Sequence, residues 1–400
     1  MNLHGRTLRR VTFAVLGFAL TLAAGGVPDD ARAAKAAAAA DAPGALVEIK
    51  PIADVDASVR SLGAEALRVL YRSTSSDGQH SVVSGALYVP AGKPPAGGWP
   101  VIAHAHGTTG VTNDCGPSSS PNLFGMIVMV VAYLKAGYAV AFTDYQGLGG
   151  GGIHVYLDNK TEGYNVIDSV RALRNAKPGL ISDRWVAIGG SQGGGASWAA
   201  AEQAPVYAPE LHLVAAVNEV PAADISGYAK IAEDQGMTPI QSAAFTAILI
   251  SQSRAHPDLD MDLYRRGSVK QNWDVLGSCK DLDGRNRAVM QIKPEELKPS
   301  THEATLKLQS LLQAMAVPKR KADAPMLVIY AGKDEYINPA WTKKAIEDAC
   351  RMGTKIEADF QADKSHGTFD GSRALDWLHD RLQGKPLTKS CVADAAAGKG

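Results

Sequence analysis

The chain has 400 residues, of which 46% are hydrophobic and 20% are charged, so it can bury a large core and has the composition of an ordinary globular protein. Its 41 basic residues balance its 41 acidic residues. Because no net positive charge is available to hold a polyanion, nucleic acid is excluded as an expected partner, and a neutral or weakly charged ligand fits better.

The N-terminus has the pattern of a signal peptide. Three arginines (Arg6, Arg9 and Arg10) precede an apolar run over 11–24, and small residues follow at 31–33. The run is shorter than the roughly 20 apolar residues that span a bilayer. We therefore predict a signal peptide over 1–33, export to a secreted or periplasmic location, and no stable membrane insertion after cleavage. Residues 34–60, which begin Ala-rich, are expected to be a lead-in segment.

Short apolar runs then alternate with segments of helical period, which is typical of a mostly parallel sheet covered by helices. The first two runs, 66–71 and 82–89, flank a turn-forming cluster and predict an antiparallel hairpin at one sheet edge. The next strand is expected over 100–106, before Gly107. The apolar segment 123–134 predicts a core helix.

The alternation continues through the rest of a first core part, 61–220, and returns in a second core part, 325–391. Right-handed crossovers would make the later strands parallel. Between the two parts, 221–324 has the pattern of helices and loops, and we predict a helical cap there, with a separate packing domain as the alternative. A flexible tail is expected over 392–400. Further strands are predicted at 138–143, 185–189, 211–217, 326–330 and 356–360, and helices at 164–176, 193–203 and 373–382.

The segment around Ser191 is the strongest functional signal. Gly189-Gly-Ser191-Gln-Gly193 lies between a β-like run and a helix-forming sequence. A serine at a sharp strand-to-helix turn takes a strained backbone conformation, and the chain on either side comes too close to admit side chains. We therefore predict that Ser191 is a nucleophile.

A serine nucleophile needs a histidine base and a carboxylate to orient that base, here in the chain order Ser, Asp, His. Asp334 follows the strand predicted over 326–330, and His366 lies in a loop after the last predicted strand. These two residues complete a predicted catalytic triad with Ser191.

Other residues compete for these roles. Glu335, Asp224 and Asp363 are alternative carboxylates, and His379 is an alternative base. We favour Asp334 and His366 because His379 falls in a predicted helix, beside Trp377 and Leu378, where a surface or packing role is expected.

The oxyanion of a tetrahedral intermediate needs two N–H donors. Gln192 is expected to supply the first because it follows the nucleophile, and Thr108 or Thr109 the second because they follow the strand over 100–106. The spacing His104-x-His106 could alternatively indicate metal ligands, but no carboxylate with ligand spacing accompanies it, so we expect no metal.

The glycine-rich stretch after Asp144 lacks the Lys-Ser/Thr of a phosphate loop, so no nucleotide cofactor is expected, and no other cofactor is indicated. Asp144 itself could orient neighbouring loops or cap a turn.

All four cysteines, Cys115, Cys279, Cys350 and Cys391, follow the predicted signal peptide. In an oxidising compartment an even number predicts two disulfides, for which three pairings are possible. Buried free thiols are the alternative, and no spacing suggests zinc.

Together these motifs resemble the secretory lipase family of α/β-hydrolases, over most of the chain after the predicted signal peptide. Besides the serine motif, the resemblance includes Asp114-Cys115-Gly-Pro-Ser118, Asp144-x-x-Gly147, Tyr207-Ala-Pro-Glu-Leu211, Asp334, Cys350 and His366. It implies triad roles for Ser191, Asp334 and His366, and oxyanion contributions from Gln192 and Thr109. It also implies the disulfides Cys115–Cys279 and Cys350–Cys391.

The leading interpretation is a secreted esterase or lipase that hydrolyses small-molecule or lipid esters through an acyl-enzyme. A polysaccharide acetyl esterase is the alternative within the same chemistry. A hydrolase fold that only binds its ligand is the alternative from another class, but such a protein is expected to have lost a triad residue, and all three candidates are present.

Overall fold

The computed structural model of the chain describes Met1 and residues 40–391. Apart from Met1, the predicted signal peptide (1–33) lies outside these residues, as do the first residues of the predicted lead-in segment and the predicted tail (392–400). In the described residues, no helix combines the length and the apolar character needed to cross a membrane.

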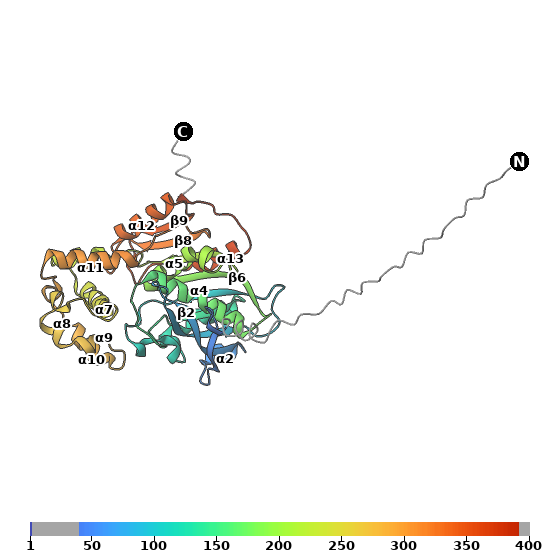
Figure 1. The fold of residues 1–400 in the computed structure, drawn as a ribbon, viewed down its shortest axis with the longest axis horizontal. Coiled ribbons are helices and arrows are strands. Elements are labelled where there is room, and N and C mark those ends of the chain that lie inside the picture. The colour runs from blue at the N-terminus through green and yellow to red at the C-terminus, as the bar shows by residue number, and fades with distance from the viewer. Residues whose placement is uncertain (2–39, 392–400) are drawn as a thin grey trace. The chain divides into compact units, whose positions relative to one another are not determined.

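A nine-stranded sheet forms the centre of the described structure, in the order β1-β2-β3-β5-β4-β6-β7-β8-β9 (Figure 1). The strands from β5 to β9 in this order are parallel, whereas β1, β2 and β3 pair antiparallel with their neighbours. The predicted mostly parallel sheet is confirmed. The strands are β1 (Leu46–Pro51), β2 (Glu65–Thr74), β3 (His80–Val89), β4 (Trp99–Ala105), β5 (Ala139–Thr143), β6 (Ile181–Gly190), β7 (His212–Glu219), β8 (Met326–Ala331) and β9 (Ile356–Gln361).

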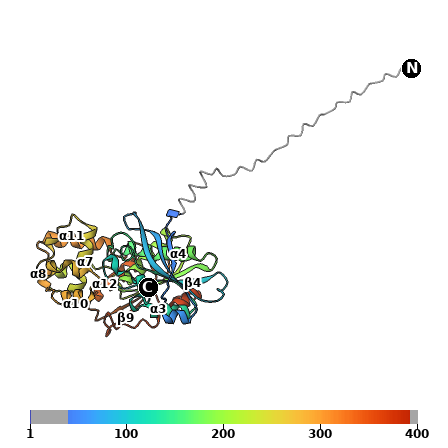
Figure 2. The same ribbon diagram turned by 90° about the horizontal axis from the view of Figure 1, so that it is seen from below.

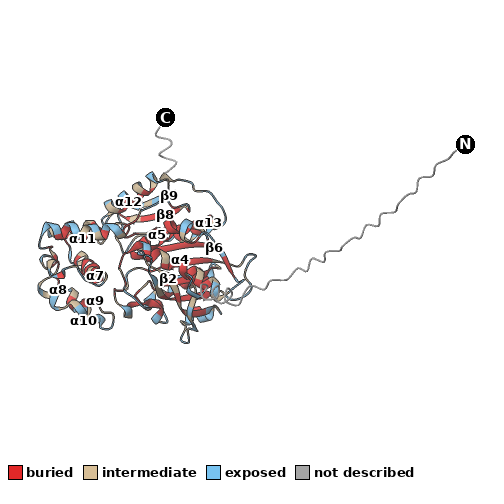
Figure 3. Ribbon diagram, in the orientation of Figure 1, coloured by how far each residue is buried: buried red, intermediate tan, exposed pale blue. Residues whose placement is uncertain are grey.

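Helices cover both faces of this sheet. Successive residues of a strand point to opposite faces, so Val101 and Ala103 of β4 enter one apolar core and Ile102 enters the other. Figure 3 shows the strands as mainly buried. One core is closed by α4 (Asn159–Ala176), α5 (Gln192–Tyr207) and α12 (Pro339–Arg351), and the other by α2 (Ala57–Ser61), α3 (Ile127–Lys135) and α13 (Ala374–Leu382).

Residues 221–324 form a helical insertion between β7 and β8. It has an apolar core of its own, in which Phe245, Tyr264 and Leu308 are fully buried. Its helices gather in one group beside the sheet, as Figures 1 and 2 both show. They are α6 (Gly227–Glu233), α7 (Pro239–Ala255), α8 (Gly267–Gln271), α9 (Trp273–Gly277), α10 (Leu282–Val289) and α11 (His302–Met315), with 3₁₀ turns at Met261–Leu263 and Pro294–Leu297.

The described part of the segment 34–60, predicted as a lead-in, contains strand β1 and helix α2. Strand β1 pairs with β2 and takes the sheet edge, so the β2–β3 hairpin is antiparallel as predicted but lies one strand further in. The sequence carried little signal for β1, since Val47 and Ile49 are exposed and the strand lacks a buried face. Helix α2 begins after Asp56, whose side chain accepts the Ser58 N–H.

The core helix predicted over 123–134 begins later than expected. Leu123, Phe124 and Gly125 have positive φ angles and form a 3₁₀ turn, so α3 begins at Ile127. Only one side of α3 is in the core, and Val128 on the other side is 66% exposed.

Candidate active site

Ser191 lies at the turn between β6 and α5, with φ 58° and ψ −118°. This is a region that side-chain-bearing residues rarely occupy. The turn is held by the Ser191 N–H, which donates to the Glu219 carbonyl at 2.9 Å, and by the Ser191 carbonyl, which accepts from Gly194 and Ala222. The surrounding backbone thus maintains the strained conformation.

Two glycines make this turn possible. A Cβ atom on Gly193 would overlap the Ala105 carbonyl oxygen, and one on Gly189 would overlap the Gly193 carbonyl oxygen. Gly190 differs, because the nearest atom to a Cβ there is 3.7 Å away, on Glu219. The steric requirement expected at Gly189 and Gly193 is therefore present in the structure.

Asp334 and His366 come together beyond the ends of β8 and β9. Nδ1 of His366 lies 2.8 Å from Oδ2 of Asp334. Oδ1 of Asp334 accepts the N–H groups of Tyr336 and Ile337 at 2.9 and 2.8 Å, which fixes the orientation of the carboxylate. The Asp334 side chain is only 4% exposed and that of His366 is 14% exposed, so solvent screens this pair weakly.

The competing residues have other partners. Glu335 accepts the backbone N–H of His366 rather than contacting its ring. Asp224 accepts the Ser226 N–H, and Asp363 is an exposed partner of Lys333. His379 contacts Tyr138 and its own helix. Of these carboxylates, only Asp334 contacts the ring of His366.

The candidate oxyanion donors lie on two loops. Gln192 is the first residue of α5, so its N–H has no acceptor within the helix. The Thr109 hydroxyl donates to the Cys115 carbonyl at 2.8 Å and is thereby occupied. The Thr108 hydroxyl instead lies 2.6 Å from the hydroxyl of Tyr156.

A cavity of about 860 Å³ connects these groups. Ser191, His366, Thr108 and Thr109 line it, and the helical insertion supplies most of the opposite wall. Most of its other lining side chains are apolar, among them Val111, Phe124, Leu157, Ile225, Ala243, Ala244, Ala247, Ile248, Leu276, Leu282, Val289 and Ile337.

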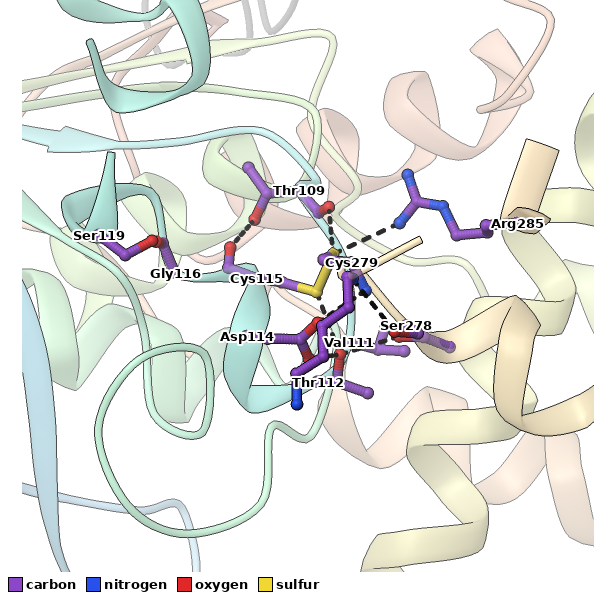
Figure 4. Close-up of a disulfide and its surroundings, with 12 residues drawn as sticks. Thr109, Val111, Thr112, Asp114, Cys115, Gly116, Ser119, Ser278, Cys279 and Arg285 are labelled. Atoms are coloured by element: carbon purple, nitrogen blue, oxygen red, sulfur yellow. Dashed lines mark hydrogen bonds between the residues drawn. A yellow bond between two sulfur atoms is a disulfide. The ribbon is translucent and has the colours of Figure 1, made fainter. Parts of the chain in front are cut away.

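A disulfide between Cys115 and Cys279 joins a loop of the sheet core to the helical insertion (Figure 4). Hydrogen bonds support this connection: Asp114 accepts the Cys279 N–H at 2.9 Å, and Thr112 donates to the Gly277 carbonyl at 2.9 Å. The other disulfide joins Cys350 to Cys391. This is the pairing that the family resemblance implied, and it leaves no free cysteine in the described residues.

The two histidines considered as metal ligands have other partners. Nδ1 of His104 contacts the Tyr133 hydroxyl, and Nδ1 of His106 contacts the Gly107 carbonyl. Burial lowers the pKa of both, to about 3 for His104. Across residues 40–391, no cluster of three or more His, Cys, Asp or Glu side chains could hold a metal ion.

Asp144 orients a loop, which was one of its two expected roles. Its fully buried carboxylate accepts the Ser118 N–H at 2.8 Å and the hydroxyls of Ser84 and Ser118. It therefore ties the loop after β4 to strand β3.

Sequence reasoning missed a group of buried polar residues behind the turn. The side-chain amide nitrogen of Gln192 donates a hydrogen bond to Oε1 of Glu162 at 2.8 Å and lies 3.1 Å from Nε2 of His154. Glu219, whose carbonyl holds Ser191, has a side chain for which burial raises the pKa to about 7. No motif in the sequence marks His154, Glu162 or Glu219 as buried.

The fold and this site define an α/β-hydrolase. A model of the secretory lipase family matches residues 124–390, and the chain belongs to that family.

Several known proteins are similar to this chain. Lipase A of Arthroderma benhamiae is 25% identical over 82% of this chain and 73% of its own, and a secreted triacylglycerol lipase of Malassezia globosa is 25% identical over 82% and 75%. A probable inactive lipase of Mycobacterium tuberculosis is also 25% identical, over 81% and 75%. Family membership therefore does not by itself establish turnover.

Solved structures share the fold. Candida antarctica lipase A in its closed state superposes with a TM-score of 0.73 at 17% identity, covering 88% of this chain and 85% of its own. The rice cell wall degrading esterase of Xanthomonas oryzae superposes with a TM-score of 0.65 at 16% identity, covering 86% and 97%.

Proposed function

We propose that this chain is an exported carboxylic ester hydrolase in which Ser191 is the nucleophile, His366 the general base and Asp334 the carboxylate that orients the base. One observation carries the proposal: the strained Ser191 and His366 line a single cavity, and the ring of His366 is bonded to a buried carboxylate.

In the first half-reaction, Nε2 of His366 takes the Ser191 hydroxyl proton as the serine oxygen attacks the ester carbonyl. Asp334 accepts a hydrogen bond from the Nδ1–H of His366, which leaves the Nε2 lone pair facing the reaction and stabilises the imidazolium. The imidazolium then gives its proton to the departing alcohol, and an acyl-enzyme remains on Ser191.

In the second half-reaction, a water molecule attacks the acyl-enzyme while His366 again takes a proton. Protonation of the Ser191 oxygen then releases the carboxylic acid. In both halves the oxyanion is stabilised by the Gln192 N–H, by donors at Thr108 or Thr109, and by the positive end of the α5 dipole.

The lining of the cavity favours an ester with an apolar acyl group. On α7, Ala243, Ala244 and Ala247 leave space for an extended chain, and most neighbouring side chains are apolar. An acetylated polysaccharide would need more polar partners than Arg285 and Asn286, the charged and amide side chains that the insertion contributes. Because the insertion forms this wall, we assign it the role of a cap.

Export is supported by the two disulfides, which persist in oxidising compartments, and by the similarity to secreted lipases.

The test is turnover of p-nitrophenyl esters from acetyl to palmitoyl by the wild type and by Ser191→Ala, with thermal melting to verify folding. The expected result is turnover that Ser191→Ala abolishes, with a preference for chains longer than acetyl. A preference for acetyl together with release of acetate from acetylated xylan would favour the polysaccharide esterase. If no ester showed turnover that depends on Ser191, the proposed hydrolase activity would be rejected. A hydrolase fold that only binds its ligand would then be the remaining interpretation.

A further inference from the structure

A short buried segment, His154–Leu157, touches both candidate oxyanion loops and the helical insertion. It lies between the glycine-rich loop after β5 and the start of α4, and the side chains of His154, Tyr156 and Leu157 are at most 6% exposed.

Tyr156 contacts Thr108 at 2.6 Å through their hydroxyls. Burial raises the pKa of Tyr156, so its hydroxyl keeps its proton. Tyr156 is only 6% exposed, and Thr108 is the hydrogen-bond partner of its hydroxyl among the described residues, so a proton that it did not give to Thr108 would be poorly satisfied. Thr108 is exposed to the cavity, so its own proton can go to water or to a ligand. Donation by Tyr156 gives the more buried of the two protons its acceptor and leaves the Thr108 proton to the cavity, which both residues line.

His154 contacts Gln192 from the other side. Nδ1 of His154 lies 2.9 Å from the Gln146 carbonyl, which can only accept, so Nδ1 carries the proton and Nε2 has a lone pair. Burial lowers the pKa of His154 to about 3, so the ring is neutral. The Gln192 amide donates one proton to this lone pair at 3.1 Å and the other to Glu162 at 2.8 Å.

Ser251 of α7 anchors the segment to the insertion. Its hydroxyl donates to the His154 carbonyl at 2.9 Å and accepts the Tyr156 N–H at 2.7 Å. One cap side chain thus fixes the backbone on both sides of residue 155.

We propose that the His154–Leu157 segment braces the oxyanion hole, with Tyr156 aiming the Thr108 hydroxyl at the oxyanion as a third donor and His154 holding Gln192. This inference rests on the proposed function, because it assumes that an oxyanion forms at Ser191. Thr108 is then a catalytic residue, whereas Tyr156, His154 and Ser251 are positioning residues.

The test is a double-mutant cycle on Thr108→Val and Tyr156→Phe, measured as kcat and KM on the best p-nitrophenyl ester. Thr108→Val is expected to lower kcat by about 10²-fold, the usual cost of one oxyanion donor, with little change in KM. Tyr156→Phe should lower kcat by about tenfold in the wild type and have no effect on top of Thr108→Val. Thr108→Ser restores the hydroxyl and should recover most of the kcat lost in Thr108→Val.

A tetrahedral boronic acid inhibitor supplies a second readout, since its affinity should fall in parallel with kcat/KM across the series. Tyr264→Phe is the matched control: its buried hydroxyl bonds the Ala304 carbonyl at 2.9 Å within the insertion, away from the cavity lining. It should change the melting temperature but not kcat. Provided that the wild type shows Ser191-dependent turnover, either of two results would overturn the proposed brace. These are additive effects of Thr108→Val and Tyr156→Phe, or an unchanged kcat in Tyr156→Phe. Absence of that turnover in the wild type would instead refute the proposed function.

Discussion

The ring of His366 and the carboxylate of Asp334 meet at 2.8 Å, and the other carboxylate oxygen of Asp334 is held by two backbone N–H groups. This arrangement makes Asp334→Asn informative. The asparagine oxygen must stay with the N–H groups of Tyr336 and Ile337, so its amide nitrogen faces His366. His366 then loses its Nδ1 proton acceptor and takes the tautomer whose Nε2 cannot accept the serine proton. We expect kcat to fall by about 10³–10⁴-fold.

Glu335→Gln is the matched control for this substitution. Glu335 accepts only the backbone N–H of His366, and glutamine keeps an accepting oxygen. Its kcat should change by less than about tenfold, since a single peripheral hydrogen bond contributes about 1 kcal/mol. If the two variants lost activity equally, Asp334 would not be the specific partner of His366. Steady-state kinetics measures both.

The glycines around Ser191 should differ in their tolerance of alanine. Gly193→Ala places a Cβ on the Ala105 carbonyl oxygen and should displace the turn, with kcat lowered by about 10²-fold or more as the geometry shifts. Gly190→Ala has 3.7 Å of clearance and should retain folding and most of the activity. Melting curves and kinetics of the two variants check this, and the reverse ranking would contradict the structure.

The two disulfides should have different effects on activity. Removing Cys115–Cys279, which closes a separation of 164 residues and borders the loop of Thr108 and Thr109, should lower both stability and kcat. The Cys350–Cys391 disulfide closes a sequence separation of 41 residues, and neither cysteine lines the cavity. Removing it should lower stability alone. Each loss is expected to cost about 2–5 kcal/mol. Double alanine variants, compared by urea unfolding and by turnover, separate the two outcomes.

Glu219 should make stability depend on pH. Burial raises its pKa to about 7 in the folded chain, from an ordinary value of 4.5. Between these values the unfolded chain has already lost a proton that the folded chain retains, so stability falls as pH rises toward 7. Glu219→Gln stays neutral, and it should gain up to about 3 kcal/mol over the wild type at pH 8 and almost nothing at pH 4.5.

Urea unfolding of both proteins at these two pH values measures the difference. The comparison cancels the parallel contribution of Glu202, whose pKa burial also raises to about 7. A difference in stability that did not grow with pH would show that Glu219 is ionised at little cost in the folded chain.

Ala247 on α7 should help to set acyl-chain length. Ala247→Phe would fill part of the cavity beyond Ser191, and a long acyl chain would lose about 0.8 kcal/mol for each methylene that it could no longer bury. The kcat/KM ratio of octanoyl to acetyl p-nitrophenyl ester should therefore fall by at least about tenfold. The acetyl ester is the internal control, and an equal loss on both esters would indicate a general disruption.

How far the sequence predicts this molecule depends on how local each signal is. The turn at Ser191 was predictable because its strand, its glycines and its helix are contiguous. Asp334 and His366 could be proposed because each lies in a loop after a predicted strand. Strand β1 was not predicted, and neither of its faces is buried in the folded chain.

The buried polar residues were not predictable for a different reason. Glu162 resembles an ordinary charged residue near a helix start, and only the folded chain places it against Gln192. Tyr156 and Thr108 likewise lie in separate loops with no shared motif. Such contacts depend on tertiary packing, which local patterns do not encode.

Covalent trapping tests whether Ser191 is a nucleophile that His366 activates. The protein would be treated with a fluorophosphonate and the adduct located by peptide mass spectrometry. We expect one adduct, on Ser191, that is absent in Ser191→Ala and forms at least about 10³-fold more slowly in His366→Ala. No adduct on the folded wild type, or an adduct on another residue, would contradict it.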